Sequence, residues 1–125
     1  MGEQPGDLAD PTPFEVGKHQ VDQAVVLTVS GEVDMLSSPM LAEAIQTALA
    51  AKPAALIVDL SKVGFLASAG MTVLVTTQAE LQPPTKFAVV ADGSATSRPI
   101  KLMGIDSVLS LYPSLNDALS ALSGA

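Results

Sequence analysis

Ser68 is the residue whose surroundings raise the clearest question about chemistry. It lies in the stretch FLASAGM, residues 65–71, between two alanines and just before a glycine. A serine nucleophile for acyl transfer needs a histidine base and an acid that orients the base. The chain has one histidine, His19, close to an expected N-terminal hairpin, and alanines stand where the G-x-S-x-G elbow has glycines. The sequence therefore argues against a serine hydrolase.

Other kinds of catalytic site also lack the residues that they need. The absence of cysteine excludes disulfides, thiolate catalysis and cysteine-ligated zinc. A single histidine leaves zinc without a plausible set of ligands, and the acidic residues are scattered singly along the chain. The G-x-x-x-x-G-K-[ST] phosphate-binding loop is also absent. We therefore expect no catalytic residues, no metal and no cofactor, and hence not an enzyme.

Length and charge narrow the choice of partners. The 125 residues fit one domain, which we place at residues 14–125, after a flexible tail at residues 1–13 rich in glycine, proline and acidic residues. A net charge of -7 argues against direct binding of nucleic acid or of an anionic membrane. No apolar run approaches the roughly 20 residues of a membrane span, and the N-terminus does not resemble a secretory signal. The expected location is cytoplasmic.

Hydrophobic patterning predicts that strands and helices alternate along the chain. Strands are expected at residues 14–21, 24–30, 54–60, 86–91 and 108–111. Helices are expected from a cap at Ser38 to an end at Pro53, at residues 69–81 and 97–103, and after a cap at Ser114. Gly31 and Asp34 are expected to mark a turn, and residues 61–68 to form a loop. The order predicts an α/β fold with an N-terminal hairpin, a mixed, mostly parallel sheet and about four helices.

This order places Ser68 between the central strand and the helix that follows it. The simplest interpretation is that Ser68 caps that helix, because serine is a favoured N-cap residue. The same position suits a phosphorylation site, because the helix dipole and free backbone N–H groups stabilise an added phosphate. The flanking alanines would leave the hydroxyl accessible on a small, apolar docking surface. Met35, Met40, Met71 and Met103 suit either an adaptable interface or the core, and we expect most of them in the core.

The chain resembles STAS-domain proteins, and specifically bacterial anti-sigma factor antagonists. Three segments carry the resemblance, which spans about residues 14–122: VVLTVSGEVDMLSSPML, LIVDLSKVGFLASAGMTVLV and FAVVADGSATSRPIKLMGIDSVLSLYPSLNDAL. The first resembles the family's strand, G-E-[LV]-D motif and first helix. The second resembles its central strand and F-[LI]-D-S-[ST]-G loop, and the third its C-terminal half. The resemblance implies a STAS-like fold and a role in regulating transcription, as in stress responses.

In that family a partner anti-sigma factor with a histidine-kinase-like fold phosphorylates the serine of the D-S-[ST]-G loop. The resemblance places this role on Ser68, with Asp34 beside it. It implies that the unmodified protein binds the anti-sigma factor and frees a sigma factor, that phosphorylation releases it, and that a phosphatase is a further partner. The residues expected to bind the partner are Asp34, Ala67, Ser68, Ala69, Gly70, Met71 and Ser94.

Two residues depart from the family's pattern. Ala67 stands where relatives carry an aspartate, and Ala69 stands where they carry a second hydroxyl. The lost carboxylate leaves open whether phosphorylation is slowed, passes to another kinase, or gives way to constitutive binding. A STAS binding module that is never phosphorylated, such as a signalling scaffold or a ligand-sensing subunit, is therefore the alternative. The lost hydroxyl leaves Ser68 as the only candidate for phosphorylation in this loop.

Overall fold

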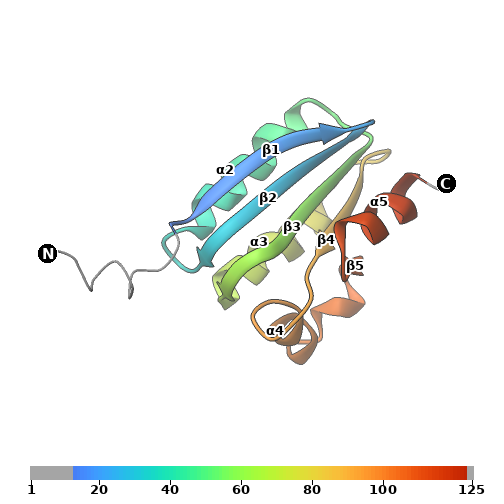
Figure 1. Cartoon of the computed structure of the whole chain (residues 1–125). Helices are drawn as coiled ribbons and strands as arrows, with labels where there is room; N and C mark the ends of the chain where they lie inside the picture. The colour runs from blue at the N-terminus through green and yellow to red at the C-terminus, as the bar shows by residue number, and fades with distance from the viewer. Residues whose placement is uncertain (1–12, 124–125) are drawn as a thin grey trace, which may run out of the picture.

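A mixed sheet with helices on both faces forms the domain in the computed structural model, which describes residues 13–123. All but the last residue of the expected tail at residues 1–13 lies outside the described part. The sheet contains β1 (Glu15–Val21), β2 (Ala24–Val33), β3 (Ala55–Leu66), β4 (Lys86–Val90) and β5 (Leu111–Tyr112), in the order β1-β2-β3-β4-β5. The β1–β2 pair is antiparallel, and every later pair is parallel (Figure 1). This confirms the predicted fold class.

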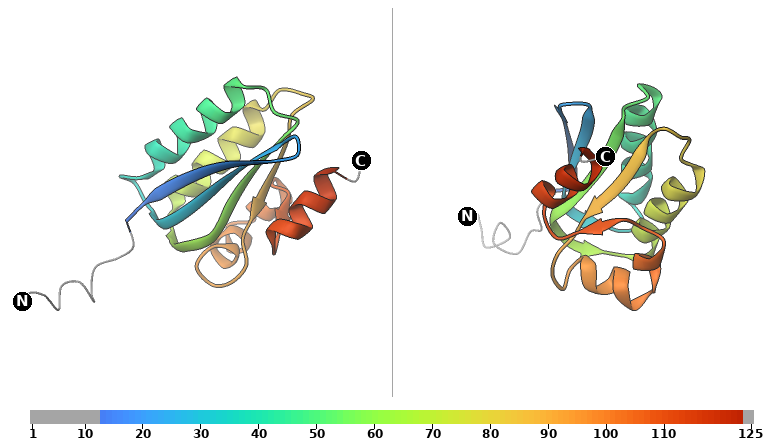
Figure 2. Two further views of the ribbon diagram at one scale, coloured as in Figure 1. Left: turned by 45° about the horizontal axis from the view of Figure 1, so that its top comes forward. Right: turned by 90° about the vertical axis from the view of Figure 1, so that its right-hand side faces the viewer.

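The helices cover the two faces of the sheet unequally. They are α2 (Ser38–Ala50), α3 (Ser68–Glu80), α4 (Ser97–Leu102) and α5 (Leu115–Ser123), with a short 3₁₀ helix, η1 (Ile105–Ser107), after α4. Helices α2 and α3 lie side by side on one face, whereas α5 crosses the other face (Figure 2). The larger core lies under α2 and α3, and the smaller one surrounds Ala118 of α5. The apolar run of β3 is buried on both faces, as its composition predicts.

Strand β3 is longer than predicted and runs through most of the expected loop at residues 61–68. Its second half pairs with the end of β2, where Glu32 aligns with Phe65. This pairing requires β2 to continue past Gly31, whose φ of 89° lies at a break in the strand register. A positive φ is readily adopted by glycine, so the residue bends the strand rather than ending it. The turn expected at Gly31 is therefore wrong, and the chain reverses only from Asp34.

Two expectations about the elements need correction, and one is confirmed. Ser38 is the first residue of α2 and not its cap, because Ser37 occupies the N-cap position; the Ser38 hydroxyl donates to the carbonyl of Asp34 at 2.6 Å. The last strand begins at Leu111, since residues that were expected to be extended from 108 complete the turn after η1. Ser114 does cap α5, where its hydroxyl accepts the N–H of Asp117 at 3.1 Å.

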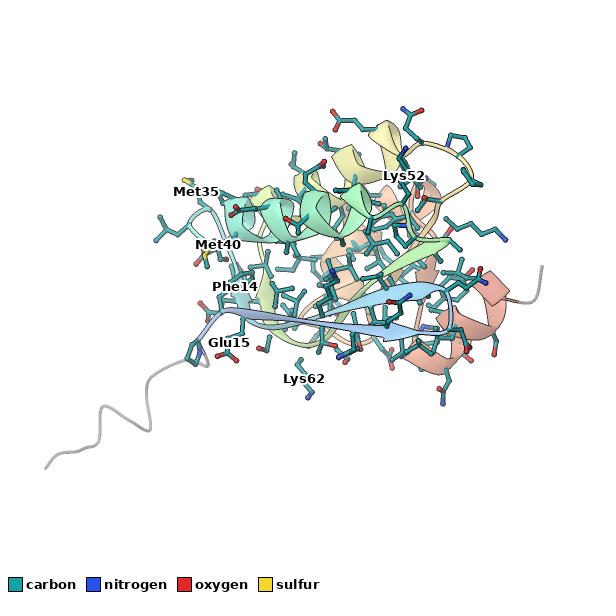
Figure 3. All side chains as sticks on the ribbon, turned by 90° about the horizontal axis from the view of Figure 1, so that it is seen from above. Phe14, Glu15, Met35, Met40, Lys52 and Lys62 are labelled. Carbon is teal, nitrogen blue, oxygen red and sulfur yellow. The ribbon has the colours of Figure 1, made fainter. Side chains whose placement is uncertain are left out.

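Most of the described methionines lie at the surface, contrary to expectation. Met71 is buried, but Met35 is 79% exposed, Met103 is 64% exposed and Met40 is 55% exposed. The expectation failed because methionine suits both a core and an adaptable surface. Position then decides: Met35 lies in a turn, and Met40 lies on the outward side of α2, whose buried residues include Leu41 and Ile45. Figure 3 shows Met35 and Met40 at the end of α2 opposite Lys52.

Candidate functional site at the carboxyl edge of the sheet

Ser68 is exposed at the first position of α3, just beyond the end of β3. The N-cap position belongs to Ala67, whose extended backbone (φ -84°, ψ 169°) is typical of an N-cap, so the prediction that Ser68 caps this helix is wrong. Alanine has no side-chain acceptor, and the helix therefore begins without a side-chain cap. Within the described residues, the Ser68 hydroxyl has no hydrogen-bond partner. The site thus combines an available hydroxyl with an uncapped helix N-terminus.

One backbone hydrogen bond brings Asp34 and Ser68 to the same place. The N–H of Ala67 donates to the carbonyl of Val33 at 2.8 Å. Asp34 directly follows Val33, and Ser68 directly follows Ala67. Two segments distant in the sequence therefore leave the sheet as neighbours, at the carboxyl ends of parallel strands where open α/β sheets hold their sites.

Gly70 allows α3 to begin so close to the sheet. A Cβ atom at this position would lie 2.5 Å from Cγ1 of Val33 and 2.8 Å from Cδ1 of Leu66. Both distances are shorter than packed carbon atoms tolerate, and the branched valine side chain has little freedom to move. Gly70 is buried, so it shapes the site by letting the helix approach and not by offering a side chain to a partner.

Asp34 holds the turn between β2 and α2 in shape. Its Oδ1 accepts the N–H groups of Leu36 and Ser37, each at 3.0 Å. The Ser37 hydroxyl lies 3.1 Å from the same oxygen and 2.8 Å from the carbonyl oxygen of Glu32. The bond from the Ser37 backbone N–H is the main cause that holds the pKa of Asp34 below its ordinary value, and the Ser37 hydroxyl and Leu36 N–H add to it. The carboxylate is therefore ionised at neutral pH and fixed in orientation.

The other residues expected to bind a partner are not equally accessible. Ala67 and Ala69 are half-buried beside Ser68, whereas the Met71 side chain faces the core. Ser94 is exposed in the loop after β4, where it lines a shallow hollow of about 520 Å³ with Asp92, Gly93, Ser97, Arg98 and neighbouring residues of α4. A partner at this edge would reach the hydroxyls of Ser68 and Ser94 but not the Met71 side chain. The binding role of the whole set remains a prediction.

Four exposed apolar side chains lie at the same edge; the sequence did not single out Leu36 and Phe65, and it left Met35 and Met40 between interface and core. We call Met35, Leu36, Met40 and Phe65 the apolar rim; their exposed fractions are 79%, 86%, 55% and 50%. They come from the turn after β2, the first turn of α2 and the end of β3. Large apolar side chains exposed at one edge of a sheet are typical of interaction surfaces. The sequence did contain a signal for this exposure. Met35 and Leu36 lie in the short segment Asp34 to Ser37 between a strand and a helix, where their side chains cannot pack into the core.

The described residues offer no catalytic machinery around Ser68. His19 lies within β1, and its Nε2 is 2.9 Å from the Thr28 hydroxyl. No group of three or more histidine, aspartate or glutamate residues in the described part is placed to hold a metal ion. Asp59 accepts the N–H of Ser61 at 2.9 Å, so its carboxylate is bonded to the backbone of its own strand, β3. The exposed Ser68 hydroxyl and the apolar rim together form a surface typical of a binding domain.

Comparisons with known proteins agree with this class. The STAS domain model matches residues 15–118, and the chain belongs to the STAS-domain family. The anti-sigma-F factor antagonist RsfB of Mycobacterium tuberculosis is 44% identical over 99 residues, which are 79% of this chain and 81% of RsfB.

Solved structures give the same result. An anti-sigma factor antagonist from Mycobacterium paratuberculosis matches with a TM-score of 0.86 and 44% identity, over 89% of this chain and 95% of that one. The antagonist SpoIIAA in its unphosphorylated form matches with a TM-score of 0.69 over 90% of this chain and 98% of its own, and at 16% identity it shows the shared fold alone. The recognised family and the regulatory, non-enzymatic class are thereby confirmed. In addition, no helix among the described residues is long and apolar enough to span a membrane.

Proposed function

We propose that this protein is an anti-sigma factor antagonist that is switched at Ser68. Its unmodified form binds an anti-sigma factor and so frees a sigma factor, and phosphorylation of Ser68 ends the complex. The observation that carries the proposal is the exposed Ser68 hydroxyl at the uncapped start of α3, next to Asp34 and the apolar rim. The 44% identity to RsfB, which is named an anti-sigma-F factor antagonist, supports the choice of partner.

The physics of this edge explains why a phosphoryl group would act as a switch. The apolar rim suits a partner surface that is dry when the complex forms. A phosphate on Ser68 adds about 1.5 to 2 negative charges, and the uncapped N–H groups and dipole of α3 stabilise it in the free protein. In the complex the same charge would have to lose water and would lie near the ionised Asp34. Phosphorylation therefore favours the free state.

The partner implied is an anti-sigma factor with a histidine-kinase-like fold that transfers the γ-phosphate of ATP to Ser68. A phosphatase would restore the unmodified form, and both reactions would take place in the cytoplasm. The STAS protein itself supplies the acceptor hydroxyl and its position, with no nucleotide of its own. SpoIIAA, which shares the fold, is described in both unphosphorylated and phosphorylated forms, which supports a phosphate-dependent cycle on this architecture.

Ala67 supports the alternative function, in which the protein binds its partner constitutively. The position has N-cap geometry, and an aspartate there would accept an N–H of the first turn of α3. Without it, the hydroxyl lacks a neighbouring carboxylate on its own segment, and Asp34 is the acid brought nearby by the fold. A STAS module that acts as a scaffold or a ligand-sensing subunit would keep the apolar rim and lose the switch.

Phosphorylation assays separate the two functions. The protein is incubated with each anti-sigma factor of its organism and ATP, and the modified residue is mapped by mass spectrometry. We expect modification at Ser68 that is absent in Ser68→Ala, with Ser120→Ala, an exposed serine on α5, as the control that retains it. A stable complex that no such kinase modifies would instead establish constitutive binding.

A second measurement tests whether the apolar rim is the docking surface. Leu36→Ser should weaken the complex in titration calorimetry because Leu36 is 86% exposed and has little role in the core. Val108→Ser is the control, since Val108 is 50% exposed after η1 and lies outside both the apolar rim and the hollow at Ser94. Equal affinities for the Leu36 variant and the unchanged protein would place the interface elsewhere.

A further inference from the structure

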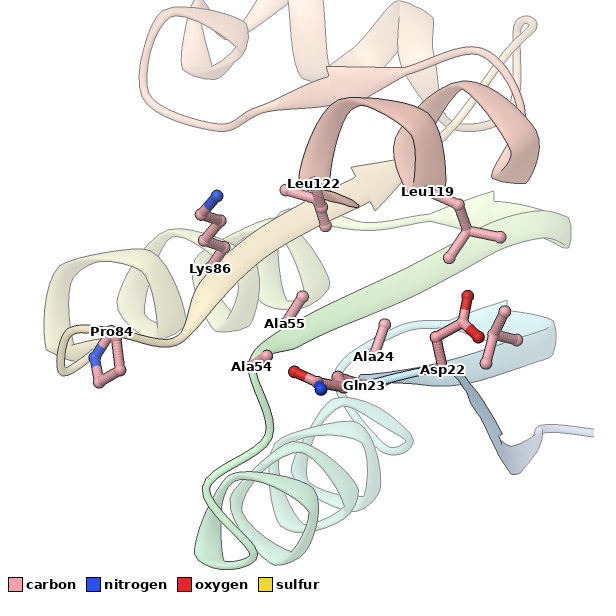
Figure 4. A pocket seen from close by; sticks show the side chains of 10 residues that line it. Asp22, Gln23, Ala24, Ala54, Ala55, Pro84, Lys86, Leu119 and Leu122 are labelled. Atoms are coloured by element: carbon pink, nitrogen blue, oxygen red, sulfur yellow. The ribbon is translucent and has the colours of Figure 1, made fainter. Parts of the chain in front are cut away.

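A pocket of about 460 Å³ lies at the amino ends of the parallel strands, at the opposite edge of the sheet from Ser68 (Figure 4). The β1–β2 turn, the starts of β3 and β4 and the last turns of α5 enclose it. Its lining is mostly small or apolar, with Asp22 and Lys86 as the charged residues. This volume falls within the range of small-molecule sites.

Small side chains in the sheet create the space. One cross-strand row on the α5 face runs through Val21, Ala24, Ala55 and Lys86. The next row along the strands has Val26 and Ile57 in its centre, and both are fully buried. Leu119 and Leu122 of α5 are only half-buried above the alanine row, since alanines are too short to fill the gap beneath them. The pocket is thus the space that the short alanine side chains of the sheet leave unfilled beneath α5.

Hydrogen bonds between neighbouring loops hold the floor of the pocket in place. The N–H of Ala54 donates to the carbonyl of Gln23 at 3.2 Å, and the carbonyl of Ala54 accepts the N–H of Lys86 at 3.0 Å. Next to these, the Thr85 hydroxyl donates to the carbonyl of Pro53 at 2.7 Å. A floor that is already ordered lowers the entropic cost of binding a ligand.

The two charges lie at opposite ends of the alanine row. Asp22 lies in the β1–β2 turn and Lys86 at the start of β4, and Figure 4 shows them on opposite sides of the pocket. The row spans three strand spacings, or about 14 Å. An extended peptide of about four residues has this length. A matching ligand would therefore carry opposite charges at its ends and an apolar middle.

We propose that this pocket binds a short linear molecule with an ammonium group at the Asp22 end, a carboxylate at the Lys86 end and an apolar middle over Ala24 and Ala55. Free ω-amino acids and short apolar peptides share this chemistry. The site is separate from the switch at Ser68 and does not depend on it.

The test uses the full chain labelled with ¹⁵N and titrated with 8-aminooctanoate and, separately, with tetra-alanine. Tighter binding of 8-aminooctanoate would identify the ligand class as ω-amino acids, and tighter binding of tetra-alanine would identify it as short apolar peptides. Octanoate and octylamine, which keep one charge each, are the controls. We expect amide shifts at Gln23, Leu119 and Leu122 but not at Ser68, and an affinity about two- to fivefold higher for a zwitterion than for either control. If neither zwitterion shifts these amides, or if both controls bind as tightly, the proposal is wrong.

Variants then assign each end of the ligand. Asp22→Asn should remove the advantage of 8-aminooctanoate over octanoate, and Lys86→Gln its advantage over octylamine. Ala54→Phe should abolish binding by filling the pocket from an exposed position, whereas Ala51→Phe, exposed and outside the lining, should bind normally. Unchanged binding by Ala54→Phe, or by both charge variants, would place the ligand elsewhere.

Discussion

The two edges of this sheet differ in structure, although the same strands form both. At the carboxyl edge, β2 and β3 run on past β4, α3 begins without a side-chain cap, and apolar side chains face outward. At the amino edge, the loops are bonded to one another and the unfilled space lies inside. The two proposals follow this difference: a partner protein would bind the outward-facing carboxyl edge, and a small molecule would enter the space at the amino edge. Changes matched between the two edges test this division.

The largest expected effect is on affinity for the anti-sigma factor, when a negative charge is placed at the carboxyl edge and, for comparison, at the amino edge. Ser68→Glu should lower affinity for the anti-sigma factor at least about tenfold, because a carboxylate would lose water in a largely apolar interface. Gln23→Glu adds the same charge at the amino edge and should leave this affinity unchanged. Titration calorimetry of both variants gives the comparison. Equal losses would mean that overall charge, and not position, controls the complex.

Gly70→Ala should destabilise the fold by about 1 kcal/mol. Strain from an added Cβ of roughly 1 to 3 kcal/mol outweighs the gain of about 1 kcal/mol in helix propensity. Gly64→Ala is the control at the same edge, since a Cβ there has nothing within 4 Å. Urea unfolding measures both free energies. If Val33→Ala does not restore part of the loss in Gly70→Ala, the close contact with Val33 is not its cause.

Ala67→Asp should stabilise the protein by about 0.5 to 1 kcal/mol, because it supplies the missing N-cap and complements the helix dipole. Ala54→Asp, an exposed change at the amino edge, should alter the free energy of unfolding by less than about 0.5 kcal/mol. Thermal and urea unfolding give these values. The same variant compared in the phosphorylation assay shows whether the missing carboxylate also limits transfer to Ser68. A destabilised Ala67→Asp would contradict the assignment of this position as the N-cap.

The smallest effect concerns the pH dependence of Asp34. Because folding lowers its pKa, this residue stabilises the protein above the pKa of the unfolded chain, and the contribution is lost as pH falls through the folded value. Asp34→Asn retains an oxygen acceptor but cannot titrate. The difference in unfolding free energy between the two proteins should therefore shrink on acidification from pH 7 to pH 3. A difference that is constant over this range would show that the turn does not depend on the charge.

The sequence predicted the elements whose pattern is set locally and missed features that depend on distant partners. The helical face of α2 and the cap of α5 follow from residues a few positions apart. The length of β3 does not, because its second half is a strand only through its pairing with β2. Ser68 was placed correctly at a strand–helix junction, yet its role as a cap was wrong by one residue. The pocket could not be predicted, because alanines on separate strands meet there only after folding.

The long end of β3 has a dynamic consequence. From Lys62 onward this strand pairs with β2 alone, since its pairing with β4 ends at Asp59. A two-stranded extension can open locally while the five-stranded part remains folded, so its amide hydrogens would exchange with solvent sooner than those of the central sheet. A kinase that must draw the Ser68 segment into its own active site would then work against the stability of this extension and not against that of the whole domain.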